Sequence, residues 1–360
     1  MNILLLASHG IAEYDDIRMF HHLGHDVFCP GGYANPAAPG ETFRPALPQV
    51  PYHPELALLC DIQRAKHKTD PGRYIDWAKA DLHPDLVDWA DVIIVHHFVR
   101  EWIGEQWNRI RHKRVVWRTC GQSDPDLERY MAQFHGLQIV RYSPAERRYF
   151  GSVGTFAGQD ALIRFGKFPQ DYGPWIPDGT VRFPDGHTGP YIANVTQHMV
   201  ERGDATGLGF YLAATEGLPA GPAGPGSKQL PNGLGALGYD AMRQYLQRAR
   251  AYIYTGTTPA SYTLGLIEAM LSGVPVVSIG KAAWAGPSEL FEGDEIAQPQ
   301  SVTFAGGDYD SNDPEWAALV LSHLLKDPVD AARLGEAQRA KAIALFGMDV
   351  IGPQWQEFLS

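Results

Sequence analysis

The chain has 360 residues, of which 44% are apolar, and a formal net charge of −11. The length favours two domains, and the composition supplies enough apolar residues for a core in each. No run approaches the roughly 18 consecutive apolar residues that a transmembrane helix needs, and the first apolar run lacks the basic flank of a signal peptide. We therefore expect a cytoplasmic protein without a membrane span.

The cysteines and the distribution of charge further limit the kinds of site and partner that the chain can have. Cys29, Cys60 and Cys120 are odd in number and widely spaced, which fits neither a disulfide framework nor a CxxC metal site. Residues 1–165 carry 18 Lys and Arg against 20 Asp and Glu, whereas the remainder carries 12 against 21. The N-terminal part therefore suits an anionic partner better than the C-terminal part.

The first 166 residues alternate between expected strands and helices. The apolar run 1–7, a helical pattern around Ile17 and Phe20, and the strand 26–28 predict the opening of an α/β unit. Residues 29–54 hold seven prolines and predict a long loop, of the kind that is either functional or mobile in a compact domain. Further elements are expected at Val92–Val95, Glu101–Arg109, Val115–Trp117, Pro125–Phe134 and Gln138–Val140. This pattern predicts a doubly wound parallel sheet with ligands at the carboxyl ends of its strands.

A second α/β series is expected over residues 191–346. Residues 167–190, rich in Pro, Gly and aromatic residues, predict an interdomain linker. The elements expected after it are a strand Tyr191–Val195, a helix Ala205–Thr215, a turn Gly217–Gly226, a helix Tyr239–Arg248, a strand Ala251–Thr255, a helix Leu264–Ser272, a strand Pro275–Ile279 and a helix Val329–Leu345. Segment 347–360 contains Trp355 and Phe358, and we expect it to return to the first domain, 1–166.

Residues 251–280 carry the clearest chemical signal. A strand enters a loop of Gly, Thr and Ser residues, and the loop opens a helix near Leu264. The free N–H groups and the dipole at that helix start favour an anion such as a diphosphate. At 100° per residue Glu268 lies about 40° from Leu264, at the edge of the apolar stripe. A carboxylate there needs donors, which either sugar hydroxyls or the N–H groups of a neighbouring loop can supply.

The same stretch resembles the donor-binding region of the family 4 retaining glycosyltransferases, on the residues Glu268-Ala-Met-Leu-Ser-Gly-Val-Pro-Val-Val. The resemblance implies the α/β GT-B fold, in which two Rossmann-like doubly wound domains face a central cleft and a C-terminal helix packs back on the first domain. It implies a nucleoside-diphosphate sugar as donor, with Glu268 on the ribose and the backbone of residues 262–264 at the diphosphate. The donor-binding residues expected are Gly10, Gln197, Thr257, Ser261, Tyr262, Thr263, Leu264 and Glu268.

The sequence departs from this family at two places. Ala260 stands eight residues before Glu268, where the family has an acid that touches the sugar. Ser261 can replace that acid in part, although capping of the helix is the simpler role. In place of the family's two basic diphosphate contacts stand Gln197 and Arg202. Arg202 can supply positive charge, or it is an ordinary exposed arginine, whereas Gln197 can donate only a neutral hydrogen bond.

Two further segments resemble the family in the first domain. Gly24-His-Asp-Val27 is similar to its Gly-His-Glu-Val entry to the second strand. The run 91–97 resembles the strand whose terminal histidine approaches the transferred sugar. The resemblance thus implies a catalytic role for His96, with His97 as substitute and Arg202 as the cation, while anchoring of a loop is the alternative for a histidine at a strand end.

The reaction that these features imply is retaining transfer from a UDP- or GDP-type sugar to a hydroxyl, without a metal or other cofactor. The acceptor is expected to be a saccharide, a small molecule or a hydroxylated base in DNA. The Asp-x-Asp pairs at 124–126 and 308–310 are interpreted as a helix cap and solvated acids, and the basic clusters at 64–68, 111–114 and 147–148 as solvated faces that could meet acceptor phosphates. The alternatives are a GT-B-fold sugar-nucleotide epimerase or hydrolase, and a catalytically silent sugar-nucleotide-binding subunit. The oligomeric state is not predicted.

Overall fold

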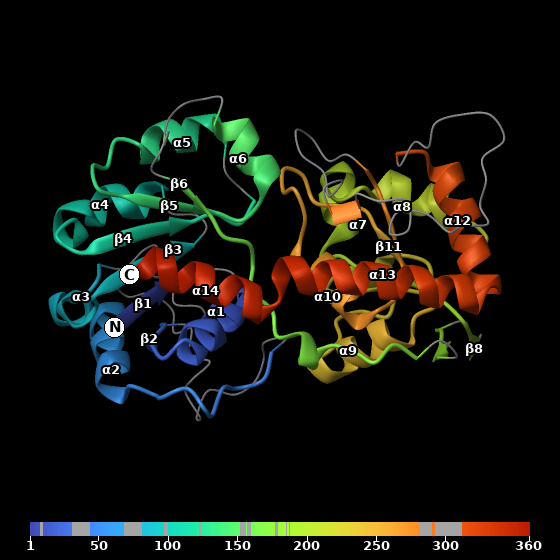
Figure 1. Ribbon diagram of the computed structural model, residues 1–360, viewed down its shortest axis with the longest axis horizontal. Coiled ribbons are helices and arrows are strands. Elements are labelled where there is room, and N and C mark those ends of the chain that lie inside the picture. The colour runs from blue at the N-terminus through green and yellow to red at the C-terminus, as the bar shows by residue number, and fades with distance from the viewer. Residues whose placement is uncertain are drawn as a thin grey trace. The chain divides into compact units, whose positions relative to one another are not determined.

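The chain forms two compact units, seen in a computed structural model (Figure 1). The N-terminal unit comprises Met1–Lys167 and Met348–Ser360, and the C-terminal unit comprises Phe168–Gly347. The structure describes residues 1–7, 10–30, 44–67, 81–96, 100–121, 124–151, 156, 160–176, 179–184, 186, 188–280, 290–291 and 312–360.

The N-terminal unit contains a parallel sheet of strand order β2-β1-β3-β4-β5-β6. Its strands are β1 (Asn2–Leu6), β2 (Asp26–Phe28), β3 (Val92–His96), β4 (Arg114–Arg118), β5 (Gln138–Arg141) and β6 (Asp160–Leu162). The strands expected from the sequence are confirmed, and β6 is an addition. Its three residues are only half-buried, and a strand so short shows no apolar run of the kind that reveals a central strand.

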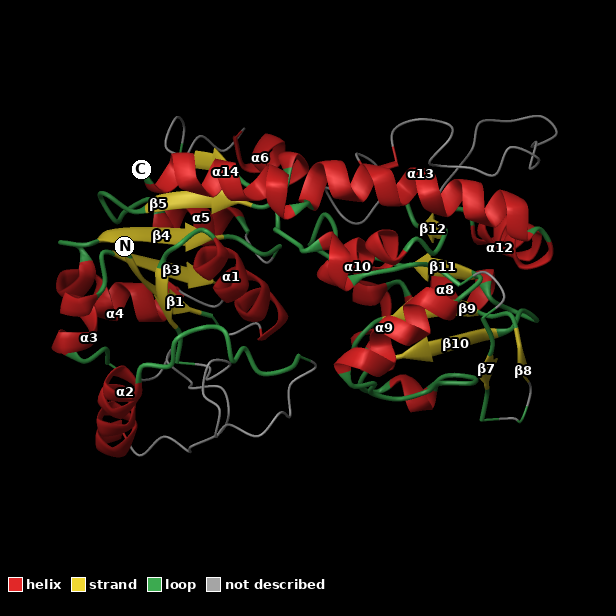
Figure 2. Cartoon of the chain, turned by 60° about the horizontal axis from the view of Figure 1, so that its bottom comes forward, coloured by secondary structure: helices red, strands yellow, loops and turns green. Residues whose placement is uncertain are grey.

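Helices cover both faces of this sheet (Figure 2). Alternate strand residues point to opposite faces: Ile93 and Val95 join a core with Trp102, while Ile94 and Val116 also have no exposed surface. The helices are α1 (Gly10–His22), α2 (Pro54–His67), α3 (Pro84–Trp89), α4 (Arg100–Ile110), α5 (Pro125–Met131), α6 (Pro144–Gly151) and α14 (Met348–Leu359). The cap expected at Asp124 is confirmed, because its side chain accepts from the Leu127 N–H at the start of α5.

The last helix, α14, packs on the N-terminal unit as expected. The Trp355 ring lies edge-on to Phe20, with ring centroids 4.9 Å apart. Arg114 Nη1 donates to the Leu359 carbonyl at 2.8 Å. Both ends of the chain therefore belong to one unit (Figure 1). In the described part of the chain no helix is both long and apolar enough to span a bilayer.

The C-terminal unit contains a smaller parallel sheet of order β10-β9-β11-β12. Its strands are β9 (Ile192–Val195), β10 (Ala220–Ala223), β11 (Ala251–Tyr254) and β12 (Val276–Ser278). Its helices are α7 (Met199–Arg202), α8 (Leu208–Ala214), α9 (Tyr239–Arg248), α10 (Leu264–Ser272), α12 (Pro314–Lys326) and α13 (Pro328–Phe346). A short hairpin of β7 (Val181–Arg182) and β8 (Thr188–Gly189) precedes the sheet.

The prediction of a turn over residues 217–226 is wrong for residues 220–223, which form strand β10. The sequence Ala-Gly-Pro-Ala has poor strand propensity, but β10 is an edge strand, where Pro222 can lack its N–H without breaking a central ladder. Gly221 is required by close packing, because a Cβ there would lie 2.4 Å from Cε1 of Phe183.

The helix expected from Ala205 begins only at Leu208, since Gly207 has a φ of +66° and interrupts the helical path.

Candidate active site

Both sheets reverse their winding at one point. In the N-terminal sheet β2 and β3 lie on either side of β1, and in the C-terminal sheet β10 and β11 lie on either side of β9. At such a point the connections leave in opposite directions and open a crevice at the carboxyl ends of the strands, where ligands of doubly wound sheets bind. Gly10 and His96 lie at the first point, after β1 and at the end of β3. Gln197 and the segment 257–264 lie at the second, after β9 and β11.

The loop between β11 and α10 is an ordered turn. Gly256 has a φ of +79°, and residues Thr257 and Ala260 form an isolated antiparallel bridge. The Thr258 N–H donates to the Ala205 carbonyl at 2.7 Å, which ties the loop to the segment before α8. Ser261 and Tyr262 are buried, with 0% and 1% of their surface exposed. The expectation that Ser261 caps the helix is wrong, because the N-cap residue is Thr263.

The start of α10 lies directly at the switch point of the C-terminal sheet. Thr263 is extended, with φ −115° and ψ 162°, and its side chain makes no capping hydrogen bond. A Cβ on Gly265 would lie 3.6 Å from the Val195 carbonyl oxygen, so the first turn of α10 adjoins the last residue of β9. A helix start without a side-chain cap presents backbone N–H groups and the positive end of the helix dipole. This arrangement can hold an anion.

Glu268 lies in the second turn of α10, and only 6% of its surface is exposed. Burial raises the pKa of Tyr252, and the nearby Glu268 charge raises it further. The Tyr252 hydroxyl oxygen accepts from the Val195 N–H at 3.3 Å. Glu268, Tyr252 and the end of β9 are therefore neighbours, as a contact between Glu268 and a ligand at the crevice requires.

Gln197 and Arg202 follow β9 and are both exposed. The Arg202 N–H donates to the His198 carbonyl at 2.9 Å in the short helix α7, and His198 adopts a left-handed φ of 53°. A Cβ on Gly224 would lie 3.0 Å from the Thr196 carbonyl oxygen, so the loop after β10 packs against the loop after β9. The diphosphate role of Gln197 and Arg202 stays a prediction.

His96 lies at the end of β3 with no exposed side-chain surface. Its Nε2 is 3.0 Å from Asp16 Oδ2, and Arg118 Nε is 3.0 Å from the same oxygen. Burial lowers the pKa of His96. Burial raises the pKa of Asp16, but Arg118, His96 and Lys167 outweigh that effect and leave it below its usual value. The role of His96 at the sugar stays a prediction, and His97 lies outside the described residues.

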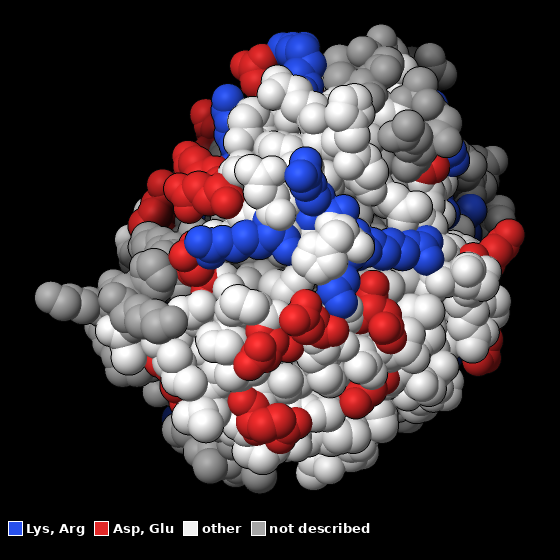
Figure 3. All heavy atoms as spheres, turned by 90° about the vertical axis from the view of Figure 1, so that its left-hand side faces the viewer, with Lys and Arg blue, Asp and Glu red and all other residues white. Residues whose placement is uncertain are grey.

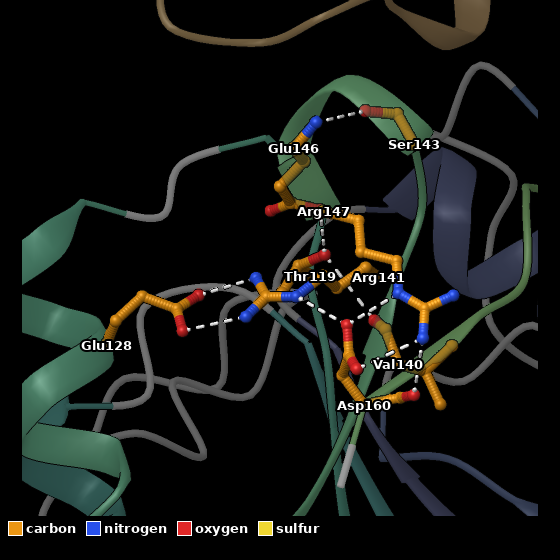
Figure 4. A network of polar contacts seen from close by, with 8 residues as sticks. All are labelled: Thr119, Glu128, Val140, Arg141, Ser143, Glu146, Arg147 and Asp160. Carbon is orange, nitrogen blue, oxygen red and sulfur yellow. Dashed lines mark hydrogen bonds and ion pairs between the residues drawn. The ribbon is translucent and has the colours of Figure 1, made fainter. Parts of the chain in front are cut away.

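Sequence reasoning missed a second group of buried charges in the N-terminal unit (Figure 4). Arg141 donates from both terminal nitrogens to Glu128, at 2.8 and 3.0 Å, and its Nε lies 3.3 Å from Asp160. Thr119 donates to Glu146 at 2.6 Å, and burial raises the pKa of Glu146 to about 7. The feature of the sequence that could have revealed these buried charges is an arginine directly at the end of an apolar strand, as in the runs 114–118 and 138–141.

The basic cluster 111–114 does not lie at the crevice in the N-terminal unit, and the cluster 64–68 lies partly outside the described residues. The turn 111–114 joins α4 to β4, at the amino ends of the strands. Figure 3 looks onto that end of the molecule and shows Lys and Arg side chains gathered at its centre, with Asp and Glu side chains beside them. Arg147 is paired with Asp160 at 2.9 Å. Arg147 belongs to α6, which follows the carboxyl end of β5, whereas the cluster 111–114 lies at the edge opposite to the one where a parallel sheet binds its ligands.

A metal site would need several His, Cys, Asp or Glu side chains close together in the described part of the chain. Among those residues no group of three or more His, Cys, Asp and Glu side chains has the placement to hold a metal ion. The pair Asp308 and Asp310 lies outside the described residues.

No protein-family model and no curated protein sequence matches the chain. Solved structures match it over its whole length. Sucrose-phosphate synthase from Thermosynechococcus elongatus superposes with a TM-score of 0.64 at 16% identity, covering 100% of this chain and 98% of that one. HepE from Anabaena, in complex with UDP-glucose, gives 0.62 at 17%, covering 100% and 99%. The chain has the GT-B fold.

A glycosyltransferase from Rickettsia africae also shares this GT-B fold, with a TM-score of 0.62 at 12% identity over 99% of this chain and 97% of that one. At these identities the likeness establishes the fold. One fold can carry several chemistries, so the function depends on the residues at the two switch points.

Proposed function

We propose that the chain is a glycosyltransferase that moves a sugar from a nucleoside-diphosphate sugar, of the UDP or GDP type, to a hydroxyl group of an acceptor. The observation that carries the proposal is the start of α10, which lies without a side-chain cap beside the end of β9, with Glu268 one turn further on. The full-length likeness to HepE, whose structure holds UDP-glucose, supports it.

In the C-terminal unit the donor would bind along this crevice. The backbone at residues 262–264 would hold the diphosphate, and Glu268 would accept hydrogen bonds from the ribose hydroxyls. Arg202, exposed on α7, would add positive charge. As the sugar leaves, negative charge develops on the diphosphate, and the cation together with the helix start would stabilise it. Thr257 and Ser261 would line the same turn.

In the N-terminal unit Gly10 and His96 would face the transferred sugar, with His97 as the substitute for His96. His96 has no exposed surface, so we propose that the bound donor reaches its ring only after the covering residues shift. The resemblance to retaining enzymes favours retention at the anomeric carbon and transfer without a metal. The acceptor would be a saccharide, a small molecule or a hydroxylated DNA base.

Donor binding tests the role of Glu268. Loss of one charge-assisted hydrogen bond of about 1.5–3 kcal/mol corresponds to at least a roughly tenfold weaker Kd. We expect this loss for Glu268→Ala and for the isosteric Glu268→Gln, measured by calorimetry with UDP, GDP and their sugars. Glu216→Ala, an exposed acid of the same unit, is the matched control and keeps the affinity of the wild type. Unchanged affinity in both Glu268 variants contradicts the assignment.

Incubation with donor alone separates the proposal from its alternatives. A transferase releases nucleoside diphosphate in proportion to an added acceptor, whereas an epimer or a free sugar formed without acceptor indicates an epimerase or hydrolase. Tight donor binding without turnover over a broad acceptor panel indicates a silent subunit. Parallel assays with EDTA test the metal, and the anomeric configuration of the product by NMR tests retention.

A further inference from the structure

The buried contact between Asp16, His96 and Arg118 places an imidazole and a guanidinium on one carboxylate oxygen. His96 Nε2 and Arg118 Nε each lie 3.0 Å from Asp16 Oδ2. The three side chains are 2% exposed or less. Isolated charges at such a depth are costly, so a set of this kind persists only when its charges compensate each other.

The charge state of this group follows from its surroundings. Arg118 is always protonated, and Asp16 is held ionised beside it by Arg118, His96 and Lys167. A carboxylate and a guanidinium already balance, and burial disfavours a further charge on His96. His96 is therefore neutral, with a single ring proton. Because Asp16 can only accept and its Oδ2 lies 3.0 Å from Nε2, the proton is assigned to that nitrogen.

The second ring nitrogen then carries a lone pair and no proton. Across the ranges that the structure describes, His96 Nδ1 has no hydrogen-bond partner although it is completely buried. Buried nitrogens are nearly always paired, and an exception at a ligand-binding edge indicates a missing partner. A lone pair is satisfied by a donor, and the O–H of a sugar is such a donor.

The Arg118 side chain is itself fixed by two aromatic rings. Its guanidinium carbon lies 5.2 Å from the centroid of Phe165 and 4.8 Å from that of Trp355 in α14. Its Nη2 donates to the Arg164 carbonyl at 3.4 Å. The carboxylate of Asp16, and through it the His96 ring, is thus held from the far side by a cation that cannot easily rotate.

We infer that Asp16 and Arg118 are positioning residues, which hold His96 as the Nε2–H tautomer so that Nδ1 accepts a hydrogen bond from a hydroxyl of the bound sugar. This rests on the proposed function for the identity of the ligand, but not for the tautomer. The ligand group assigned to this spot is a hydroxyl that donates, rather than a carbonyl or phosphate oxygen, which could not.

The tautomer can be read without any activity. In protein labelled with 15N-histidine, the resonances of His96 are identified by their loss in His96→Gln, and the two-bond couplings to the ring protons report which nitrogen is protonated. We expect an unprotonated Nδ1 and a protonated Nε2 in the wild type at neutral pH. An Nδ1–H tautomer or a charged imidazolium overturns the inference, whether or not the protein proves to be a transferase.

Two substitutions then test which nitrogen meets the ligand. The amide of Gln can replace Nε2 and still donate to Asp16, whereas the amide of Asn reaches only to the position of Nδ1. We expect His96→Gln to unfold like the wild type but to lose roughly tenfold or more in kcat/KM, with the Kd of UDP alone unchanged. His96→Asn should keep more activity and lose thermal stability. The reverse order of activities overturns the inference, whereas an inactive wild type refutes the proposed function alone.

Discussion

Substitution of the buried acid Glu146 by glutamine should remove a pH dependence of stability from the N-terminal unit. Glu146 has no exposed surface, and its Oε1 has no partner among the described residues. Thr119 donates to its other oxygen at 2.6 Å, and Ser143 caps its backbone N–H at 3.0 Å. Burial raises the pKa of Glu146 from 4.5 to about 7, although Thr119 and Arg141 oppose the rise.

The sign and size of the effect follow from linkage. Between pH 4.5 and about 7 the folded state binds a proton that the unfolded state releases, so the free energy of unfolding falls as the pH rises through this interval. At 1.36 kcal/mol for each unit of pKa difference, the full penalty above pH 7 is about 3 kcal/mol. Glutamine has the shape of the protonated acid and no charge at any pH, so Glu146→Gln should recover this free energy at pH 8 and change little at pH 5.

Calorimetric unfolding at pH 5, 6, 7 and 8 measures the effect. For a unit of this size, about 3 kcal/mol corresponds to a rise in Tm of roughly 6–12 °C at pH 8. The two units can unfold in separate transitions, so the shift should appear in the transition that UDP does not move. Glu105→Gln, an exposed acid on α4, is the matched control and should leave every transition in place. A gain of equal size at pH 5 and pH 8, or a loss at pH 8, refutes the reasoning.

Two further substitutions test the packing of each unit. Gly335→Ala should lower the Tm of the C-terminal unit, because a Cβ at this position in α13 would lie 2.1 Å from the Gly273 carbonyl oxygen. Its control is Gly209→Ala in α8, where a Cβ would meet nothing within 4 Å. The control should be neutral or stabilise the unit by about 0.5–1 kcal/mol. Trp355→Ala should cost the N-terminal unit about 3–5 kcal/mol in urea unfolding, since it removes a fully buried ring from Phe20 and Arg118. A small effect of Trp355→Ala would mean that α14 contributes little to that unit.

Local patterns were sufficient for most of the architecture. The apolar runs that became β1, β3, β4 and β5 are short and bounded by polar residues, as strands covered on both faces require. Helix α10 was expected at Leu264–Ser272 and lies there, because Gly273 ends it with a φ of +80°. Such signals depend on neighbours in the sequence, so they can be read without the fold.

Where local propensity and tertiary contact disagree, the sequence pointed the wrong way. Residues 220–223 have the composition of a turn, yet they pair with β9. The hydrogen bonds to β9 and the contact with the Phe183 ring stabilise a strand that these residues do not favour by their own propensity. Helix α2 was not expected, because it follows a proline-rich segment. Strand β6 was not expected either, because its three half-buried residues are too few to show a pattern.

The sequence by itself predicted an anion-binding turn after β11, since a loop of small residues, a helix start and Glu268 stand within one short stretch. Only the tertiary structure decided that this helix start adjoins the end of β9, and that His96 is buried against Asp16 and Arg118. These residues are 80 and 22 positions from His96 in the chain. No local pattern encodes such a meeting, because the order of the strands in the sheet, and not their order in the chain, brings the carboxyl ends together.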